Sequence, residues 1–185
     1  MGKLKNLYAF VGRSGIGKTT IVETLGKTYE WKQAESYTDR PKRKPNESGH
    51  IFITPEEFNN LKGLLLPTTF NGCRYAMTKE ILDNADLIVV DPKGVMDVKT
   101  DYTDRKIIVI GLHCDVRILE KRMYNRGDSS GQVKSRLEHD DVVFKDMDNL
   151  CDVIVNNDGD FNVTIRLIEA IIRFYESMWG VIWNK

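Results

Sequence analysis

A glycine-rich segment near the start of the chain carries the residues best suited to chemistry. Residues 12–19 match the pattern G-x-x-x-x-G-K-[ST], between a short apolar run and a helical pattern. The glycines let consecutive backbone N–H groups turn inward around an anion, the lysine reaches the β- and γ-phosphates, and the threonine hydroxyl binds Mg²⁺. The motif therefore predicts an ATP and Mg²⁺ site that contains Gly12, Ser14, Gly15, Gly17, Lys18, Thr19 and Thr20. Lys18 is its expected catalytic cation and Thr19 its expected metal ligand.

An aspartate follows a second apolar run. Asp91 comes directly after residues 87–90, where a carboxylate leaving a buried strand would face the phosphate loop. There it would hold Mg²⁺ or the water molecules around the ion, as a catalytic and metal-binding residue. Because Asp91 precedes Pro92, it is also a good N-cap for a helix. The residues alone leave both roles open.

Two basic clusters are candidates for binding further phosphate groups. Arg40 and residues 42–44 place four cations within five residues, which suits a phosphate grip but also a solvated loop or a nucleic-acid patch. In the second cluster Arg122 and Arg126 lie four apart on one helix face, and Arg136 follows a short polar link at 127–131. This spacing suits a lid that closes over transferring phosphates, with ordinary surface charge as the alternative.

The elements that must position these residues alternate between strand and helix. Apolar runs predict buried parallel strands at 7–11, 87–90, 107–112 and 153–155. Helical spacing predicts helices at 19–29, 116–123, 133–143 and 163–179. The alternation favours a single α/β domain with helices on both faces of an open sheet and ligands beyond the carboxyl ends of its strands. Residues 38–78 depart from this pattern, with a basic loop, a helix beginning near Pro55 and short aromatic strands, and are predicted to form an insertion.

Composition narrows the class of partner. The chain has 185 residues with 27 basic and 27 acidic side chains, and this zero net charge argues against a general nucleic-acid binder. Cys73, Cys114 and Cys151 have neither disulfide nor zinc-site spacing, which favours a reducing cytoplasm. The N-terminal residues do not resemble a secretory signal, and the apolar runs are too short to span a membrane. The sequence thus predicts a cytoplasmic protein without nucleic-acid or membrane partners. The apolar stripe at 163–179 is expected to face the core, or otherwise a second copy.

The order of these motifs resembles that of the guanylate kinase family over nearly the whole chain. After the phosphate loop come Ser36, Thr38, Arg40 and Arg43 in the pattern S-x-T-x-R-x-x-R, then the aromatic segment at 50–52. The segment 70–76 is similar to the family's F-S-G-x-x-Y-G, and 91–95 to D-x-Q-G-V. Residues 121–127 with 136–137 match the lid pattern, and 153–158 match the closing strand V-I-V-N-x-D.

This resemblance implies a P-loop kinase core with an open parallel five-stranded sheet. Residues 1–37 and 79–185 would form the core, 38–78 a nucleoside-monophosphate-binding insertion, and about 122–136 a lid. The implied activity is transfer of the γ-phosphoryl group of Mg-ATP to a nucleoside monophosphate, by default GMP or dGMP, by a monomer or homodimer.

The resemblance also gives roles to individual residues. Arg126 and Arg136 would contact the transferring phosphoryl group, with Arg122 a weaker candidate, and Asn156 and Asn157 would lie near the adenine. The acceptor would be bound by Ser36, Arg40, Arg43, His50, Tyr75 and Thr78. Arginine forks suit phosphate oxygens, and phosphoryl transfer depends mostly on positioning and charge stabilisation.

The chain departs from the family where the guanine base would be read. Leu66 falls on the family's glutamate, and Met77 falls on a small hydroxyl residue with Thr78 next to it. A carboxylate that pairs with guanine N–H groups is not replaced by leucine without loss of discrimination. Three alternatives therefore stay open: a kinase of another nucleotide, a kinase of a sugar phosphate, and a phosphopeptide-binding module without activity. The intact Gly17-Lys18-Thr19 argues against the module.

Overall fold

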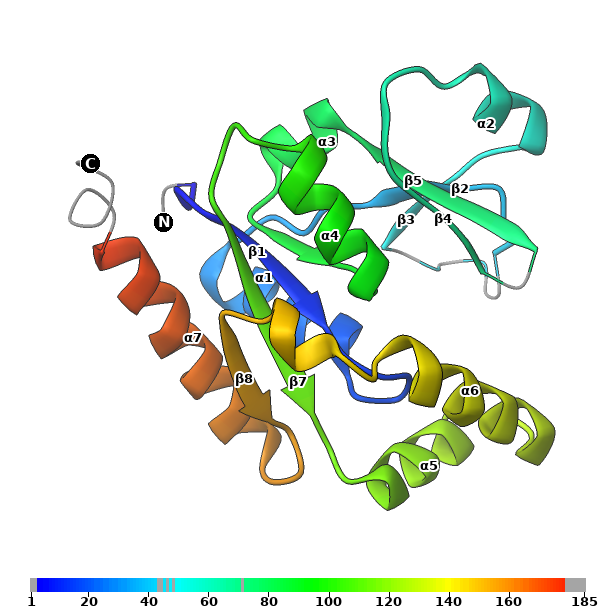
Figure 1. Ribbon diagram of the computed structural model, residues 1–185, viewed down its shortest axis with the longest axis vertical. Coiled ribbons are helices and arrows are strands. Elements are labelled where there is room, and N and C mark those ends of the chain that lie inside the picture. Colours follow the sequence, from blue (N-terminus) through cyan, green and yellow to red (C-terminus); the bar gives the residue numbers. More distant parts are fainter. Residues whose placement is uncertain (1–2, 43–44, 46, 48, 71, 179–185) are drawn as a thin grey trace.

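A parallel four-stranded sheet forms the centre of the computed structural model, which describes residues 3–42, 45, 47, 49–70 and 72–178 (Figure 1). Its strand order is β6-β1-β7-β8. The strands span Leu7–Val11 (β1), Leu87–Val89 (β6), Ile107–His113 (β7) and Val153–Asn156 (β8). Every residue of β1 is buried, as expected for a central strand covered on both faces.

Helices cover both faces of this sheet. Tyr8 and Phe10 of β1 pack in one core with residues of α1 (Lys18–Tyr29), α5 (Val116–Asn125) and α7 (Phe161–Ser177). The alternate residues Leu7, Ala9 and Val11 pack in a second core with α3 (Lys79–Asn84), α4 (Pro92–Asp101) and the 3₁₀ helix η1 (Met147–Leu150). The two-residue period of β1 thus divides the molecule into three layers.

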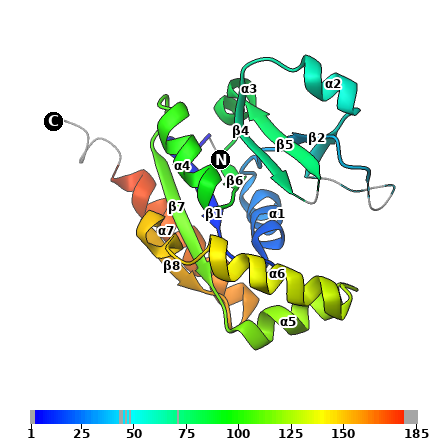
Figure 2. The ribbon, with the colours of Figure 1, turned by 45° about the vertical axis from the view of Figure 1, so that its right-hand side comes forward.

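A second sheet lies beside the first, at the upper right of Figure 1. It contains β2 (Ser36–Thr38), β3 (His50–Phe52), β4 (Leu64–Phe70) and β5 (Cys73–Thr78) in the order β3-β2-β5-β4. The short helix α2 (Pro55–Asn60) connects β3 to β4, and a capping box between Thr54 and Glu57 fixes its start. In Figure 2 this sheet and the pair α5 and α6 (Ser130–Val143) lie on opposite sides of α1.

The sequence prediction of five strands in the main sheet is wrong. The segment after α1 reaches the edge of β6 only through an isolated parallel bridge between Gln33 and Leu87. The Ala34 N–H donates to the Leu87 carbonyl over 2.8 Å, and the chain then enters β2 of the second sheet at Ser36. A fifth strand is therefore reduced to a single bridge, because the following residues pair with β3 and β5 instead.

The C-terminal helix α7 buries only part of its apolar stripe. Ile165, Ile168 and Ile172 are in the core, whereas Leu167 and Phe174 are exposed. Trp179, which the stripe was expected to include, lies outside the described residues. Within the described ranges, no helix is long and apolar enough to cross a membrane.

Candidate active site

The phosphate loop connects β1 to α1 and is held tightly against the rest of the core. Gly15 and Gly17 have φ values of 77° and 98°, in the left-handed region that favours glycine. A Cβ atom on Gly12 would lie 2.9 Å from the Leu112 carbonyl oxygen of β7, and one on Gly15 would lie 3.0 Å from the Leu119 carbonyl oxygen of α5. The loop therefore requires glycine both for its turn and for its packing, and it leaves a cradle of backbone N–H groups at the start of α1.

Lys18 is folded back onto this loop. Its Nζ donates to the carbonyl oxygen of Gly12 and, over 3.1 Å, to that of Arg13. Burial lowers the pKa of Lys18 to about 8, while the negative charges of Asp140 and Asp91 raise it and the positive charge of Arg126 lowers it further. Lys18 thus lies where charged groups from three other segments converge.

Phosphate binding by the free protein is expected to weaken as the pH rises through about 8. The charged form of Lys18 binds phosphate, and its pKa of about 8 means that a proton must be taken up for binding above that pH. We expect the Kd for a non-hydrolysable ATP analogue to be constant from pH 6.5 to 7.5 and to rise severalfold by pH 9. Lys18→Arg, which stays charged, should bind independently of pH. A constant Kd for the wild type up to pH 9.5 would contradict this assignment.

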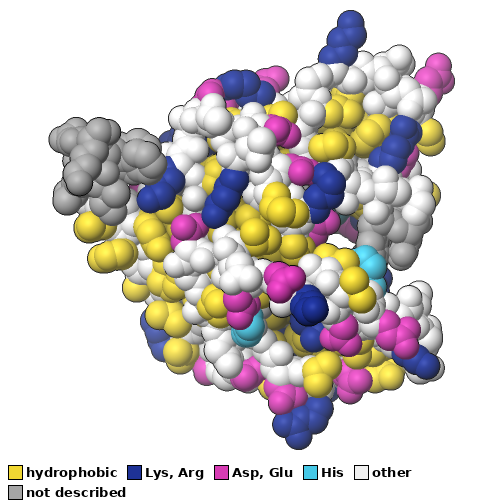
Figure 3. Space-filling model, in the orientation of Figure 1, with side chains coloured by type: hydrophobic (Ala, Val, Ile, Leu, Met, Phe, Trp, Pro, Cys, Tyr) yellow, Lys and Arg dark blue, Asp and Glu magenta, His cyan; other side chains and the backbone are white. Residues whose placement is uncertain are grey.

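Two cavities open on either side of Ser14 and Lys18. The first, of about 720 Å³, is lined by the phosphate loop, the start of α1, Asn157, Phe161 and three arginines. The second, of about 490 Å³, lies against the second sheet. Figure 3 shows the surface hollowed between the second sheet and α6. Because Ser14 and Lys18 line both cavities, groups bound in the two would meet at the phosphate loop.

The two predicted lid arginines line the first cavity from the end of α5 and from within α6. Arg126 at the C-terminal end of α5 forms an ion pair with Asp128. The Nε of Arg136 in α6 lies 3.7 Å from Oδ2 of the same carboxylate. Asp128 thus gathers both guanidinium groups at the cavity, where they can exchange a carboxylate for phosphate oxygens.

Arg122 and Asn157 both hydrogen-bond to the backbone of the phosphate loop. Arg122 donates to the Ile16 carbonyl over 3.2 Å and to the Asn157 carbonyl over 2.9 Å. The Asn157 amide, 2% exposed, donates to the same Ile16 carbonyl over 2.8 Å and accepts from the Thr164 hydroxyl. Both residues line the first cavity, and both bond the carbonyl oxygen of Ile16 in the phosphate loop.

Of the two asparagines that the resemblance places near the adenine, Asn157 lines this cavity, and Asn156 is not among its described lining residues. The Asn156 side chain donates to Asp158 over 2.8 Å in an exposed turn. Alternation along β8 gives the reason: Val155 and Asn157 are buried, while Ile154 and Asn156 are exposed. The same two-residue period, read from the sequence, identifies the inward asparagine.

Register in the second sheet brings together three of the predicted acceptor residues. Ser36 pairs with His50 across β2 and β3, and Thr38 pairs with Tyr75 across β2 and β5. The Ser36 hydroxyl lies 2.8 Å from Nδ1 of His50, and the His50 and Tyr75 rings are 5.5 Å apart. Ser36, His50 and Tyr75 all line the second cavity. They form a polar wall able to donate several hydrogen bonds.

Arg40 lies behind this wall and is engaged by a carboxylate. Its guanidinium forms a fork with Glu47, at 2.7 and 3.3 Å, and its Cζ lies 5.2 Å from the centre of the Phe52 ring. Among the described residues, its buried Nε has no hydrogen-bond partner. Hydrogen bonding to Glu47 raises the pKa of Arg40, so the group stays charged. Arg43, the second predicted phosphate ligand here, lies outside the described residues.

Asp91 takes the capping role, one of the two that the sequence allowed. It is the N-cap of α4, where its Oδ1 accepts from the Gly94 N–H over 2.6 Å, and its Oδ2 accepts from the Thr68 hydroxyl over 3.5 Å. It also lines the second cavity. Thr78 caps α3, where it accepts from the Ile81 N–H, and it is not among the described residues that line that cavity.

Apolar side chains line the second cavity at the positions where guanine-reading groups were expected. Leu66 and Met77 are each 6% exposed, and both line the cavity. Leu66 has a φ of 55°, at an irregularity between Leu65 and Thr68 in the pairing of β4 with β5. The residues lining the cavity include Asp91, Asp97 and Asp140, but not Glu47, Glu56 or Glu57. No glutamate among the described lining residues therefore substitutes for the expected one.

The sequence reading missed Asp140 of α6. This carboxylate is buried, lines the second cavity and accepts a hydrogen bond from the Ser14 N–H over 2.6 Å. A helical period from Val133 through Leu137 places position 140 on the inward face, so a charged residue there was the available signal.

Comparison with known proteins identifies similar structures but no similar sequence family. No protein-family model matches the chain, and no curated protein matches its sequence. Among solved structures, guanylate kinase from Anaplasma phagocytophilum is similar over 95% of this chain and 88% of its own, with a TM-score of 0.68 and 16% identity. A gluconokinase from Sinorhizobium meliloti 1021 is similar over 99% of this chain and 100% of its own, with a TM-score of 0.55 and 14% identity. The chain therefore has the α/β fold of P-loop kinases, and its similarity to guanylate kinase agrees with the motif order.

Proposed function

We propose that the chain is an ATP-dependent nucleoside monophosphate kinase. The observation that carries the proposal is the pair of cavities meeting at Ser14 and Lys18, one lined by the phosphate loop and arginines, the other by the second sheet. A phosphotransferase needs this arrangement, because donor and acceptor must align in line across the transferred group. The similarity to guanylate kinase supports a nucleoside monophosphate as the acceptor, with GMP or dGMP as the first candidates.

On the donor side, the N–H groups of residues 14–19 would bind the phosphates of ATP. Lys18 would exchange the carbonyl oxygens of Gly12 and Arg13 for β- and γ-phosphate oxygens. Thr19, exposed in the first cavity, and Asp91, in the second, would hold Mg²⁺ or its water molecules, because Mg²⁺ takes few protein oxygens beside phosphate and water. When bound, Mg²⁺ would offset negative charge on the β- and γ-phosphates.

On the acceptor side, Tyr75 and His50 would bind the monophosphate together with Arg40, which would exchange Glu47 for phosphate oxygens. An acceptor phosphate oxygen would attack the γ-phosphorus, and the bond to ADP would break. Since that oxygen already carries charge, no general base is required. Arg126 and Arg136 would turn from Asp128 to the transferring group and stabilise its spreading charge.

One observation favours a second candidate, a sugar phosphate as acceptor. Leu66 and Met77 provide no polar group at the positions expected to read guanine. The cavity keeps polar groups in Ser36, His50 and Tyr75, which would serve a phosphorylated sugar as well as a nucleotide. The phosphopeptide-binding module is less well supported, because the donor-side cavity retains a full phosphate loop and its arginines.

The test is ADP release from Mg-ATP, measured by a coupled assay against ribo- and deoxynucleoside monophosphates and a set of sugar phosphates. Turnover with a nucleoside monophosphate at least a hundredfold above the ATP-only rate is expected. Preference for a sugar phosphate would replace the proposal with the second candidate. Absence of turnover with every compound in the panel, although ATP binds, would refute both kinase candidates and favour the phosphopeptide-binding module.

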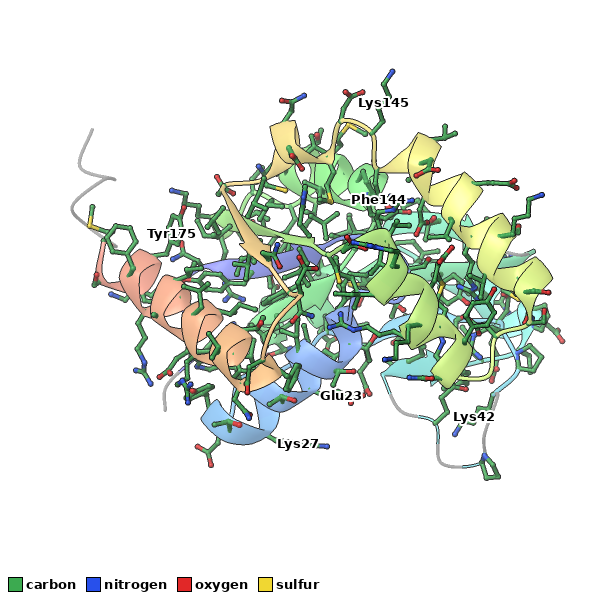
Figure 4. The ribbon with its side chains drawn as sticks, turned by 90° about the horizontal axis from the view of Figure 1, so that it is seen from below. Glu23, Lys27, Lys42, Phe144, Lys145 and Tyr175 are labelled. Carbon is green, nitrogen blue, oxygen red and sulfur yellow. The ribbon has the colours of Figure 1, made fainter. Side chains whose placement is uncertain are left out.

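Arg40→Ala is expected to raise the acceptor KM by about 10- to 100-fold and to change the ATP KM by less than twofold. The reason is loss of a charge-assisted fork to the acceptor phosphate, worth about 1.5–3 kcal/mol. Lys42→Ala is the matched control, because Lys42 lies over the same Phe52 ring (5.2 Å) and is exposed (Figure 4). Steady-state kinetics with each substrate varied separately gives the result. An equal rise in the ATP KM would show that Arg40 does not act on the acceptor.

A further inference from the structure

A buried carboxylate occupies the phosphate loop in this structure. Asp140 of α6 is 3% exposed, and its Oδ2 accepts from the Ser14 backbone N–H over 2.6 Å. Val133 and Asp140 are the described side chains that α6 buries. A buried carboxylate is stable only when its charge is compensated. Here the partners are the Ser14 N–H, the ring of His139, whose Nδ1 lies 3.4 Å from Oδ1, and the charge of Lys18, whose pKa the charge of Asp140 raises.

Neighbouring contacts fix α6 to the same loop. Arg13 donates to the Leu137 carbonyl over 3.2 Å and pairs with Asp141. Residues 137, 140 and 141 of α6 therefore hold positions 13 and 14 of the loop. Arg136 lies one helical turn before Asp140, so any displacement of Asp140 from the loop also moves the part of α6 that carries Arg136.

The Asp140 contact conflicts with nucleotide binding. The N–H groups of such a loop bind β- and γ-phosphate oxygens, so a donor phosphate and the Asp140 carboxylate compete for the Ser14 N–H and repel each other. The carboxylate thus takes the place of an anionic ligand.

We propose that Asp140 is an internal ligand of the phosphate loop, which the donor's phosphates must displace. Donor affinity is then lower than the loop alone would give, because only the fraction of molecules with Asp140 released can bind. The displacement frees α6, and Arg136 reaches the transferring group only after a donor has arrived. This inference rests on the proposed function only in requiring that the loop binds nucleotide phosphates.

The test uses Asp140→Asn and Asp140→Ala in the full chain, with inorganic tripolyphosphate as the probe and isothermal titration calorimetry, with and without Mg²⁺. Asparagine removes the charge but keeps an acceptor for the Ser14 N–H. The asparagine variant should therefore fold even if the alanine variant does not. Glu138→Gln is the matched control, because it removes the same charge from an exposed position of α6 that pairs only loosely, at 3.8 Å, with Lys134. All four proteins are compared at one ionic strength, after circular dichroism has confirmed the fold.

Asp140→Asn and Asp140→Ala are expected to bind tripolyphosphate about tenfold more tightly than the wild type, and Glu138→Gln to stay within twofold of it. Equal or weaker binding by folded Asp140 variants, or no binding by any protein, would overturn the proposal; a merely structural Asp140 would weaken binding when removed. The outcome is independent of the acceptor. Tighter binding without turnover in the substrate panel would refute the proposed function alone, and turnover without tighter binding would refute the internal ligand alone.

Discussion

Lys18→Ala is expected to lower kcat/KM for ATP by about 10³-fold or more while leaving the fold intact. Lys18 lines both cavities and is the cation of the phosphate loop. Removing it takes away the charge that offsets the developing negative charge between donor and acceptor, which in comparable sites is worth several kcal/mol. The fold should survive, because among the described residues the ammonium donates to carbonyl oxygens of its own loop, and Asp140 keeps its hydrogen bond from the Ser14 N–H when Lys18 is removed.

Lys27→Ala is the matched control for this variant. Lys27 lies in the last turn of the same helix α1 and projects from its outer end (Figure 4). Kinetics of both variants, with circular dichroism and urea unfolding, separate a catalytic loss from a folding defect. Activity of Lys18→Ala within tenfold of the wild type would remove the basis of the proposed mechanism.

Arg136→Ala is expected to lower kcat by about 10²- to 10³-fold, with a change of less than threefold in ATP affinity. Arg136 contacts Asp128 in the free protein and would reach the phosphates only as the transition state forms. Its removal should therefore lower kcat rather than the affinity for ATP. Single-turnover rates and direct ATP titration give the two quantities.

Lys134→Ala provides the comparison for Arg136→Ala. Lys134 is an exposed cation on the same helix and pairs with Glu138 rather than facing the cavity. It should leave kcat within twofold of the wild type. If Arg136→Ala matched that control, or if it raised the ATP Kd in proportion to its loss of rate, the lid role would be contradicted.

Local signals in the sequence predict most of the core. The apolar run at 7–11 is a strand with those bounds, and the glycine pattern after it is a tight loop because its φ values and close contacts leave no room for other residues. The prediction of a fifth strand was wrong for a non-local reason. The residues after Gln33 pair with β3 and β5, and no local sequence pattern decides which of two sheets a segment joins.

The candidate site was predictable where a motif fixes the chemistry and less so where tertiary contacts fix it. Lys18, Arg126 and Arg136 line one cavity, and Ser36, His50 and Tyr75 line the other. Asp140 accepts a hydrogen bond from a backbone N–H far away in the sequence, and Thr78 caps α3. Both outcomes depend on how helices α3 and α6 pack, which residue types alone do not specify.

The transfer itself can be followed directly with ATP labelled in its γ-phosphoryl group. The protein, labelled ATP, Mg²⁺ and the best acceptor from the panel are incubated, and the products are separated by chromatography. The account predicts that the label appears in the phosphorylated acceptor, a nucleoside diphosphate, in an amount equal to the ADP formed, and that Lys18→Ala forms almost none. Label found only in inorganic phosphate, or retained entirely in ATP while acceptor and ATP are both bound, would contradict the account.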